Sequence, residues 1–346
     1  MERMRKSPTR LSILETFFMN IPVALFVSVF LCASTLSPKA GWAEQINLGY
    51  SGTGLNSTLR GVIEKERLWQ KRGREVRSIY FNSGNLTSQA LLGGDIQIAD
   101  GDLNAPLTMA VAGILDLKIF AVTFPRLQHL FVVRSHVEKP QDLKGKKVAV
   151  SSYGSVSDSM TRLVLRFWRI EPEKEVAILP SGNTPTRIAA LVTGRVDGGL
   201  VTPEQLHRVL ATGCCRVLAD LADVPLDYAL YGLVAPISFL RSQSSAARRF
   251  LEGVIEGIAV FKTRQDLVLE VLREEGMKDR DLATQIHNRL TKSLRPEPVP
   301  EPTGVQAVLD SSLNPRARTA RAQDFIDATL LDQIRASGFI DRLYRK

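Results

Sequence analysis

The chain has 346 residues, with 45 Lys and Arg against 36 Asp and Glu, which gives a formal net charge of +9. Hydrophobic residues make up 44% and charged residues 23%, as in globular proteins, and the length suits two domains. The basic excess is spread over predicted helices such as residues 63–77 and forms no single stripe. A nucleic-acid partner is therefore not expected.

The first 43 residues have the pattern of a signal peptide. Four basic residues precede an apolar run from Phe17 to Leu36, and small residues follow at Gly41 and Ala43. We expect cleavage after Ala43 and export. An uncleaved anchor is the alternative, because the run is nearly long enough to span a bilayer. Without residues 1–43, 40 basic and 34 acidic residues remain, so the net charge falls to about +6.

The mature chain keeps two cysteines, Cys214 and Cys215. Neighbouring cysteines close at best a strained ring, so they cannot hold distant parts of the fold together. We expect two buried thiols at the start of a strand over residues 215–221, although the sequence leaves their redox state open.

A segment of about twenty residues occurs twice. Ser-Gly-Asn stands at residues 83 and 181, an offset of 98, and Ala-Leu-x-x-Gly stands at residues 90 and 190, an offset of 100. A two-residue insertion in the second helix would reconcile the offsets. A period of this size indicates a duplicated domain.

Each copy reads strand, Gly/Ser loop, helix, strand, loop, short helix, strand. In the first copy we expect strands at 46–50 and 76–81, with a helix at 55–70 that Gly73 ends. In the second, a strand at 146–151 leads to a helix from Val156. This alternation predicts an α/β fold with parallel sheets covered on both faces.

The repeated short helix of the second copy has its own start and stop signals. Thr184 is predicted to cap a helix that begins at Pro185 and ends at Gly194. Beyond residue 235 the pattern is helical, with helices near 265–275 and 280–293 and again from Val305. We expect this tail to pack onto one lobe.

Four stretches carry a family resemblance: INLGY, the run from FNSGN to GGDIQIADGD, FVVRSHVEKPQDLKGKKVAVSSYGS, and ALVTGRVDGGLVTPEQL. The sequence resembles the periplasmic substrate-binding proteins of ABC importers, in the NMT1/THI5-like branch of sulfonate, nitrate and thiamine-precursor binders. The resemblance implies the α/β type II periplasmic-binding-protein fold, with two Rossmann-like lobes, a ligand cleft between them and a helical C-terminal extension. It implies that the strands around 131–134 and 231–236 cross between the lobes.

The implied organisation is a signal peptide at 1–43, a first lobe at 44–131, a second lobe at 132–232, and a return to the first lobe with C-terminal helices at 233–346. The implied function is capture of a small-molecule solute by lobe closure and delivery to a membrane ABC permease. A periplasmic monomer without cofactor or catalysis is expected, and the sequence does not identify the solute.

Two alternatives stay open. One is an enzyme on the same scaffold, like the fungal thiamine-pyrimidine synthases. Those proteins carry a cysteine-rich segment and metal-binding histidines, whereas His129, His207 and the other two histidines here are isolated in the sequence. The other alternative is a binding protein that feeds a sensor.

Polar residues at strand ends and helix starts are the candidate ligand contacts, because ligands of open α/β sheets bind there. Ordinary turn and cap chemistry is the alternative for each of them. A capping box of Ser155 and Asp158 makes an anion at that helix start less favourable, and Arg187 is predicted to lie in solvent. The candidates are Ser51, Thr53, Asn85, Asp100, Tyr153, Gly154, Ser155, Asn183, Thr202 and Glu204.

Overall fold

The computed structural model describes residues 45–51, 55–224 and 227–345. The predicted signal peptide and Thr53 lie outside these residues. Within the described ranges, none of the helices combines the length and the apolar character needed to cross a membrane.

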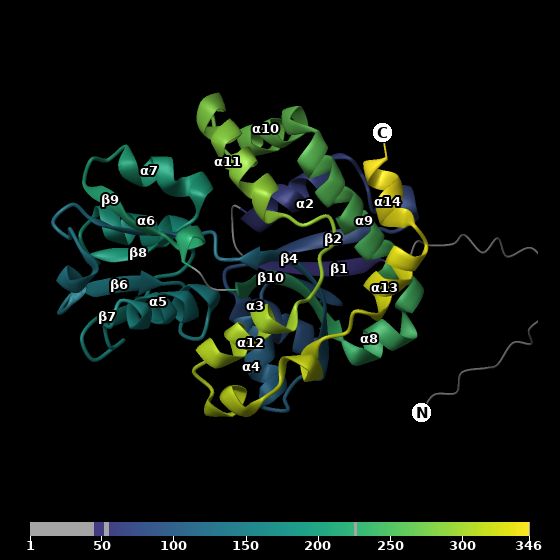
Figure 1. Ribbon diagram of the computed structural model, residues 1–346, viewed down its shortest axis with the longest axis horizontal. Helices are drawn as coiled ribbons and strands as arrows, with labels where there is room; N and C mark the ends of the chain where they lie inside the picture. The colour runs from purple at the N-terminus through teal and green to yellow at the C-terminus, as the bar shows by residue number, and fades with distance from the viewer. Residues whose placement is uncertain (1–44, 52–54, 225–226, 346) are drawn as a thin grey trace, which may run out of the picture. The chain divides into compact units, whose positions relative to one another are not determined.

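The first sheet has five strands in the order β2-β1-β3-β10-β4 (Figure 1). β1 pairs in parallel with β2 and β3, and β10 runs antiparallel between β3 and β4. The strands are β1 (Ile46–Ser51), β2 (Val76–Phe81), β3 (Ile98–Asp102), β4 (Leu117–Arg126) and β10 (Asp227–Pro236).

The second sheet repeats this arrangement in the order β7-β6-β8-β5-β9. β6 pairs in parallel with β7 and β8, and β5 runs antiparallel between β8 and β9. The strands are β5 (Leu130–Arg134), β6 (Lys147–Val150), β7 (Ala177–Pro180), β8 (Gly198–Val201) and β9 (Cys215–Asp220).

The two sheets therefore share one topology, as the sequence repeat predicts. The expectation of purely parallel sheets is wrong, because each sheet contains one antiparallel strand. In each sheet the antiparallel strand is the one that the chain enters directly after leaving the other sheet. β5 follows β4 of the first sheet, and β10 follows β9 of the second. We call the first sheet with its helices the first lobe and the second sheet with its helices the second lobe.

Three helices belong to each copy of the unit. The first lobe has α2 (Leu55–Lys65), α3 (Gly84–Gly93) and α4 (Asn104–Val111). The second lobe has α5 (Val156–Phe167), α6 (Thr184–Val192) and α7 (Leu206–Leu210). In the described part of the chain, six short 3-10 helices complete the connections: η1 (Gln70–Arg72), η2 (Pro140–Leu143), η3 (Pro203–Gln205), η4 (Leu221–Asp223), η5 (Pro315–Thr319) and η6 (Ala322–Phe325).

The repeated helices α3 and α6 correct two predictions. They begin at residues 84 and 184 and their following strands at 98 and 198, so the offset is a constant 100. The Ser-Gly-Asn triplets are therefore not equivalent, because residues 84 and 85 belong to α3 whereas residues 181–183 precede α6. The cap of α6 is Asn183 and not Thr184, because the Asn183 side chain accepts a hydrogen bond from Thr186 N at 3.2 Å. Ser83 holds the equivalent position at α3.

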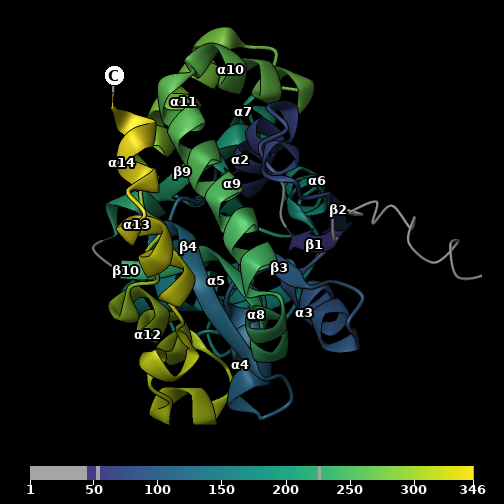
Figure 2. The same ribbon diagram turned by 90° about the vertical axis from the view of Figure 1, so that its right-hand side faces the viewer.

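The C-terminal region is helical and packs mainly against the first lobe. α9 contacts α2, α12 contacts β10, and α13 and α14 lie along α9 (Figure 2). α10 and α11 form where the sequence predicts helices. The helices are α8 (Ile237–Ser242), α9 (Ser244–Thr263), α10 (Gln265–Glu274), α11 (Arg280–Ser293), α12 (Pro302–Ser311), α13 (Thr329–Ala336) and α14 (Phe339–Tyr344).

Helix α9 packs closely against the first lobe at Trp69. Its indole stacks on Phe250 with ring centroids 5.2 Å apart, and its Nε1 donates to the Phe250 carbonyl at 3.2 Å. Gly253 and Gly257 of α9 lie against Trp69 and Ile63, and neither position has room for a Cβ atom without a shift of these side chains. Because these two glycines have no side chain, α9 can pack closely against Trp69 and Ile63 of the first lobe.

β5 sends alternate side chains to the two faces of the second sheet. Phe131 and Val133 join the main core, whereas Leu130 and Val132 join a smaller cluster with Ile188 and Leu191 of α6. Because these two apolar residues anchor α6 to the sheet, the polar residues at the start of the helix are held in a fixed orientation.

Candidate functional site

A polar cavity lies between the two lobes, and we call it the inner cavity. It leaves about 50 Å³ for the centres of water-sized molecules, enough for a few waters. The N-terminal ends of both repeated helices, α3 and α6, border it. Its lining residues are Ser51, Tyr80, Asn82, Ser83, Gly84, Asp102, His129, Ser151, Val156, Ser157, Asn183, Thr184, Arg187, Thr202 and Tyr231.

Arg187 brings a buried positive charge to the inner cavity. Its side chain is 5% exposed, so the prediction that it lies in solvent is wrong. Its Nη atoms donate to the Gly182 and Leu200 carbonyls and to Thr184 Oγ1 at 2.9–3.3 Å. Thr184 and Arg187 stand three residues apart, which places them on one face of α6.

The guanidinium of Arg187 lacks a carboxylate partner. Among the described residues no Asp or Glu forms an ion pair with it, and its Nε has no hydrogen-bond partner there. Burial lowers the pKa of Arg187 to about 10, so the group remains a cation at neutral pH. A buried cation without a counter-ion is unfavourable unless an anion joins it.

Asp102 brings a carboxylate to the same cavity from the first lobe. It ends β3, is 6% exposed and accepts a hydrogen bond from Ala105 N at 3.4 Å. Its Oδ2 lies 1.9 Å from the position that a Cβ atom would take at Gly84, so the absence of a side chain there lets the carboxylate fit. Burial raises the pKa of Asp102 to about 6, which leaves it mostly ionised at neutral pH.

His129 lies in the connection between β4 and β5 and also lines the cavity. It is 3% exposed, and its ring meets Tyr231 edge-on with centroids 6.4 Å apart. Burial, with the charges of Arg187 and Arg289, lowers the pKa of His129 to about 3. The imidazole is therefore neutral at physiological pH, and its buried Nδ1 has no hydrogen-bond partner among the described residues.

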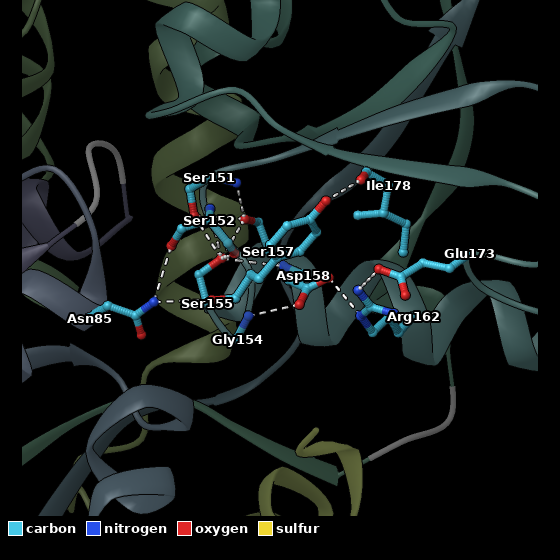
Figure 3. Close-up of polar contacts among 11 residues, drawn as sticks. Asn85, Ser151, Ser152, Gly154, Ser155, Ser157, Asp158, Arg162, Glu173 and Ile178 are labelled. Atoms are coloured by element: carbon cyan, nitrogen blue, oxygen red, sulfur yellow. Dashed lines mark hydrogen bonds and ion pairs between the residues drawn. The ribbon is translucent and has the colours of Figure 1, made fainter. Parts of the chain in front are cut away.

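A network of serine hydroxyls forms the start of α5 (Figure 3). Ser151 Oγ donates to Ser155 Oγ at 2.7 Å, and Ser151 N donates to Ser157 Oγ at 2.8 Å. Gly154 N donates to the Asp158 carboxylate at 2.8 Å. The predicted contact between Ser155 and Asp158 forms, because Ser155 Oγ accepts from Asp158 N at 3.5 Å, and the Asp158 carboxylate takes up the Gly154 amide. Ser151, Val156 and Ser157 of the same helix start line the inner cavity.

A larger cavity adjoins the inner one, and we call it the outer cavity. Its volume is about 580 Å³, and it shares Tyr80 and Asn183 with the inner cavity. Burial raises the pKa of Glu204 in its wall to about 7. The lining residues are Tyr50, Ser57, Arg60, Tyr80, Asn183, Pro185, Glu204, Gln205, His207, Arg208, Leu272, Glu275 and Met277.

The predicted contact residues separate into groups. Ser51, Asn183 and Thr202 line the inner cavity, and Glu204 joins Asn183 in the outer one. Asp100 is buried near Arg60, outside both linings. Ser155 caps α5. Asn85, Tyr153 and Gly154 line a third cavity of about 230 Å³.

Asn85 makes a direct contact between the lobes (Figure 3). Its Nδ2 donates to Ser152 Oγ at 3.3 Å and to the Tyr153 carbonyl at 3.0 Å. Tyr153 itself is 50% exposed, and its hydroxyl donates to the Ile178 carbonyl at 3.1 Å. These contacts join α3 to the loop before α5 at the edge of the inner cavity.

Several lining residues were missed by the sequence reasoning, chiefly Asp102, His129, Arg187, Tyr80 and Tyr231. Two signals could have found some of them. Asp102 ends the strand after the first repeated helix, as Thr202 follows the equivalent strand of the second copy. Arg187 follows Thr184 at helical spacing. Nothing local in the sequence marks His129, because its burial depends on both lobes.

A profile of the NMT1/THI5-like family matches residues 70–266, more than half of the chain. The chain belongs to the NMT1/THI5-like family. The taurine-binding periplasmic protein of Escherichia coli (strain K12) is 31% identical over 148 residues, which are 42% of this NMT1/THI5-like chain and 43% of the relative. The chain thus aligns with less than half of the length of this curated relative.

Solved structures share the fold. The alkanesulfonate-binding protein SsuA from Xanthomonas axonopodis pv. citri, bound to MOPS, has a TM-score of 0.63 at 17% identity, over 87% of this chain and 94% of that one. The aliphatic sulphonate binding protein SsuA from Escherichia coli has a TM-score of 0.65 at 19% identity, over 82% and 92%. These similarities confirm the predicted periplasmic-binding-protein fold, and the helical C-terminal extension is present as predicted.

Proposed function

We propose that this chain is an extracytoplasmic solute-binding protein that closes its two lobes on a small molecule and delivers it to an ABC importer. The single observation that carries the proposal is the buried guanidinium of Arg187, which lines a cavity between two lobes and has no carboxylate partner in the described part of the chain. The family and the fold support it, because its relatives are named as periplasmic binding proteins.

The proposed solute carries an anionic group, which would pair with Arg187. Charge-assisted hydrogen bonds to a guanidinium are strong and directional. Nε of Arg187 supplies a free donor among the described residues. Because the inner cavity is small, a compact group such as a sulfonate or carboxylate fits better than a bulky one.

The opposite wall favours a positive group on the same solute. Asp102 approaches the cavity from the first lobe, whereas Arg187 approaches it from the second. A short zwitterion would bring an anion to one lobe and an ammonium to the other, so that binding draws the lobes together. Taurine, the solute named for the Escherichia coli relative, has this chemistry.

We infer capture without chemical change, in a protein exported by the segment before residue 44 and acting as a monomer with a membrane permease. The first lobe would extend over 44–131, the second over 132–232, and the chain would return to the first at 233–346. Of the predicted contacts, Ser51, Asn183 and Thr202 are the proposed neighbours of the solute in the inner cavity.

The proposal is tested by mass spectrometry of the native protein from its source compartment, which should reveal a small anion or zwitterion released unaltered on denaturation. Added back to stripped protein, that compound should raise the melting temperature and reduce the radius of gyration in X-ray scattering. A bound compound that emerges chemically changed would indicate the enzyme alternative. Stabilisation without compaction would contradict closure.

A further inference from the structure

Cys214 and Cys215 form a close thiol pair at the beginning of β9, the edge strand of the second sheet. Their Sγ atoms lie 2.9 Å apart, and both cysteines are free. The pair lines neither the inner nor the outer cavity. Solute binding therefore does not explain it.

The two thiols differ in exposure. Cys214 is half-buried, whereas Cys215 is 7% exposed and belongs to the apolar cluster beneath α6. The prediction of two buried thiols is correct for Cys215 only. An incoming reagent therefore meets Cys214 first, and Cys215 lies directly behind it.

The surroundings also distinguish the two sulfur atoms. Thr212 Oγ1 lies 3.0 Å from Cys214 Sγ. Although burial opposes it, contacts with Cys215 and Thr212 and the positive charge of Arg134 lower the pKa of Cys214. Burial, followed by the neighbouring Cys214, raises the pKa of Cys215 to about 12. A thiolate is the attacking species in thiol–disulfide exchange, so Cys214 is the favoured nucleophile.

We propose that Cys214 and Cys215 are a vicinal dithiol that exchanges with small or protein disulfides and closes to a disulfide between adjacent residues. Cys214 attacks one sulfur of the incoming disulfide, which forms a mixed disulfide and releases one thiolate that takes up a proton. Cys215 then loses its proton and attacks Cys214 Sγ, which releases the second thiolate. The cysteines lose two electrons and two protons, and the incoming disulfide becomes two thiols.

The closed ring would be easily reduced. Consecutive Cα atoms are about 3.8 Å apart across a trans peptide, closer than the roughly 4.4–6.8 Å of ordinary disulfides. Strained disulfides have more oxidising potentials and are the labile ones. The pair thus acts as a reversible modification site and not as a structural link.

The site lies at the end of α6 that is remote from the cleft. Arg134, whose charge acts on both thiols, donates to the carbonyls of Leu191 and Val192 at 3.1 and 3.3 Å. These carbonyls end the helix whose first turn carries Thr184 and Arg187. The thiol chemistry is therefore separate from the proposed solute contacts, and its test does not depend on them.

The test uses the mature chain, first reduced and freed of reductant, then incubated with oxidised glutathione. After denaturation and alkylation with iodoacetamide, intact mass spectrometry should show a protein two hydrogen atoms lighter that carries no alkyl group. Mild dithiothreitol should restore two alkylation sites. Alkylation of both thiols after oxidation, a lasting glutathione adduct or a disulfide-linked dimer would each overturn the proposal.

Two single variants test the order of attack. Cys215→Ser should retain one glutathione as a stable mixed disulfide on Cys214, because the resolving thiol is missing. Cys214→Ser should react far more slowly while folded, since Cys215 is buried. Equal rates for the two variants would contradict the assigned roles. Circular dichroism checks that both fold, and the wild-type mass measurement stands by itself if either does not.

Discussion

The side-chain amide of Asn85 donates a hydrogen bond to the backbone carbonyl of Tyr153 at 3.0 Å. Asn85 belongs to α3 of the first lobe, whereas Tyr153 lies before α5 in the second. Gly84, which precedes Asn85, and Ser151, two residues before Tyr153, line the inner cavity. This contact is thus made next to the proposed solute, and it depends on the lobes being close together.

Replacing Asn85 by Ala should weaken solute binding without destabilising the fold. Asn85 makes two hydrogen bonds to the second lobe, and the loss of one of them costs about 0.5–1.5 kcal/mol, which corresponds to a roughly two- to twelve-fold higher dissociation constant. Calorimetric titration with the solute measures this dissociation constant. The matched control is Gln89→Ala, which removes an exposed amide from the same helix. Equal affinity of the Asn85 variant and wild type would exclude a role in closure.

Gly84→Ala should disturb Asp102. The new Cβ atom would lie 1.9 Å from Asp102 Oδ2, so the carboxylate or the start of α3 must move, at a cost of about 1–3 kcal/mol in the free energy of unfolding. Gly93→Ala, where the nearest atom is 3.4 Å away, controls for helix propensity. Urea denaturation compares the two, and a Gly84 variant as stable as the control contradicts the packing described.

The charge of Asp102 predicts a pH dependence of ligand choice. Burial raises its pKa to about 6, so below that pH the carboxyl is increasingly protonated and no longer attracts an ammonium group. Affinity for taurine should therefore fall as the pH drops through 6, about tenfold per unit at the lower end. Affinity for ethanesulfonate, which lacks the amine, should not fall.

Asp102→Asn supplies the control for this titration. It should bind taurine weakly at every pH and abolish the difference between the two pH profiles. Parallel profiles for taurine and ethanesulfonate in wild type would show that no ammonium group lies at Asp102.

His129 predicts a loss of stability in mild acid. Burial lowers its folded pKa to about 3, whereas the unfolded histidine titrates near 6.5. Between pH 6.5 and 3 the imidazole is therefore protonated in the unfolded state but not in the folded state. The free energy of unfolding consequently falls as the pH drops from 6.5 towards 3. At pH 5 this loss is about 2 kcal/mol.

The buried carboxyls have an opposite effect, because their pKa values are raised. The measurement is therefore the difference in unfolding free energy between wild type and His129→Gln. From pH 7.5 to 5, wild type should lose about 2 kcal/mol relative to the variant. Curves that stay parallel would mean that His129 titrates normally.

The sequence predicts the duplication well because the repeat is local. Ser83 and Asn183 open equivalent helices, and Gly94 and Gly194 adopt the left-handed conformation after them. The antiparallel strands could not be predicted in the same way. The family resemblance implied that the strands around 131–134 and 231–236 cross between the lobes, and β5 and β10 do follow strands of the other sheet. Their antiparallel pairing is not recorded in any local pattern.

The site was harder to predict than the fold. Ser51, Asn183 and Thr202 follow from the rule that ligands bind at strand ends and helix starts. The burial of Arg187 depends instead on which side of α6 faces the sheet. That orientation is set by the packing of Ile188 and Leu191 against β5, which is a tertiary contact. His129 lies between the lobes and gains its low pKa from charges remote in sequence, Arg187 and Arg289.

The central claim is that Arg187 holds the anionic group of the solute. Calorimetric titration of taurine, ethanesulfonate and short carboxylates into wild type, Arg187→Met and the exposed control Arg166→Met tests it most directly. Loss of a buried charge partner is worth about 2 kcal/mol or more, so Arg187→Met should weaken the best-bound anion at least about 30-fold, and Arg166→Met should not. An Arg187→Met protein that folds and binds the anion as tightly as wild type would contradict the account.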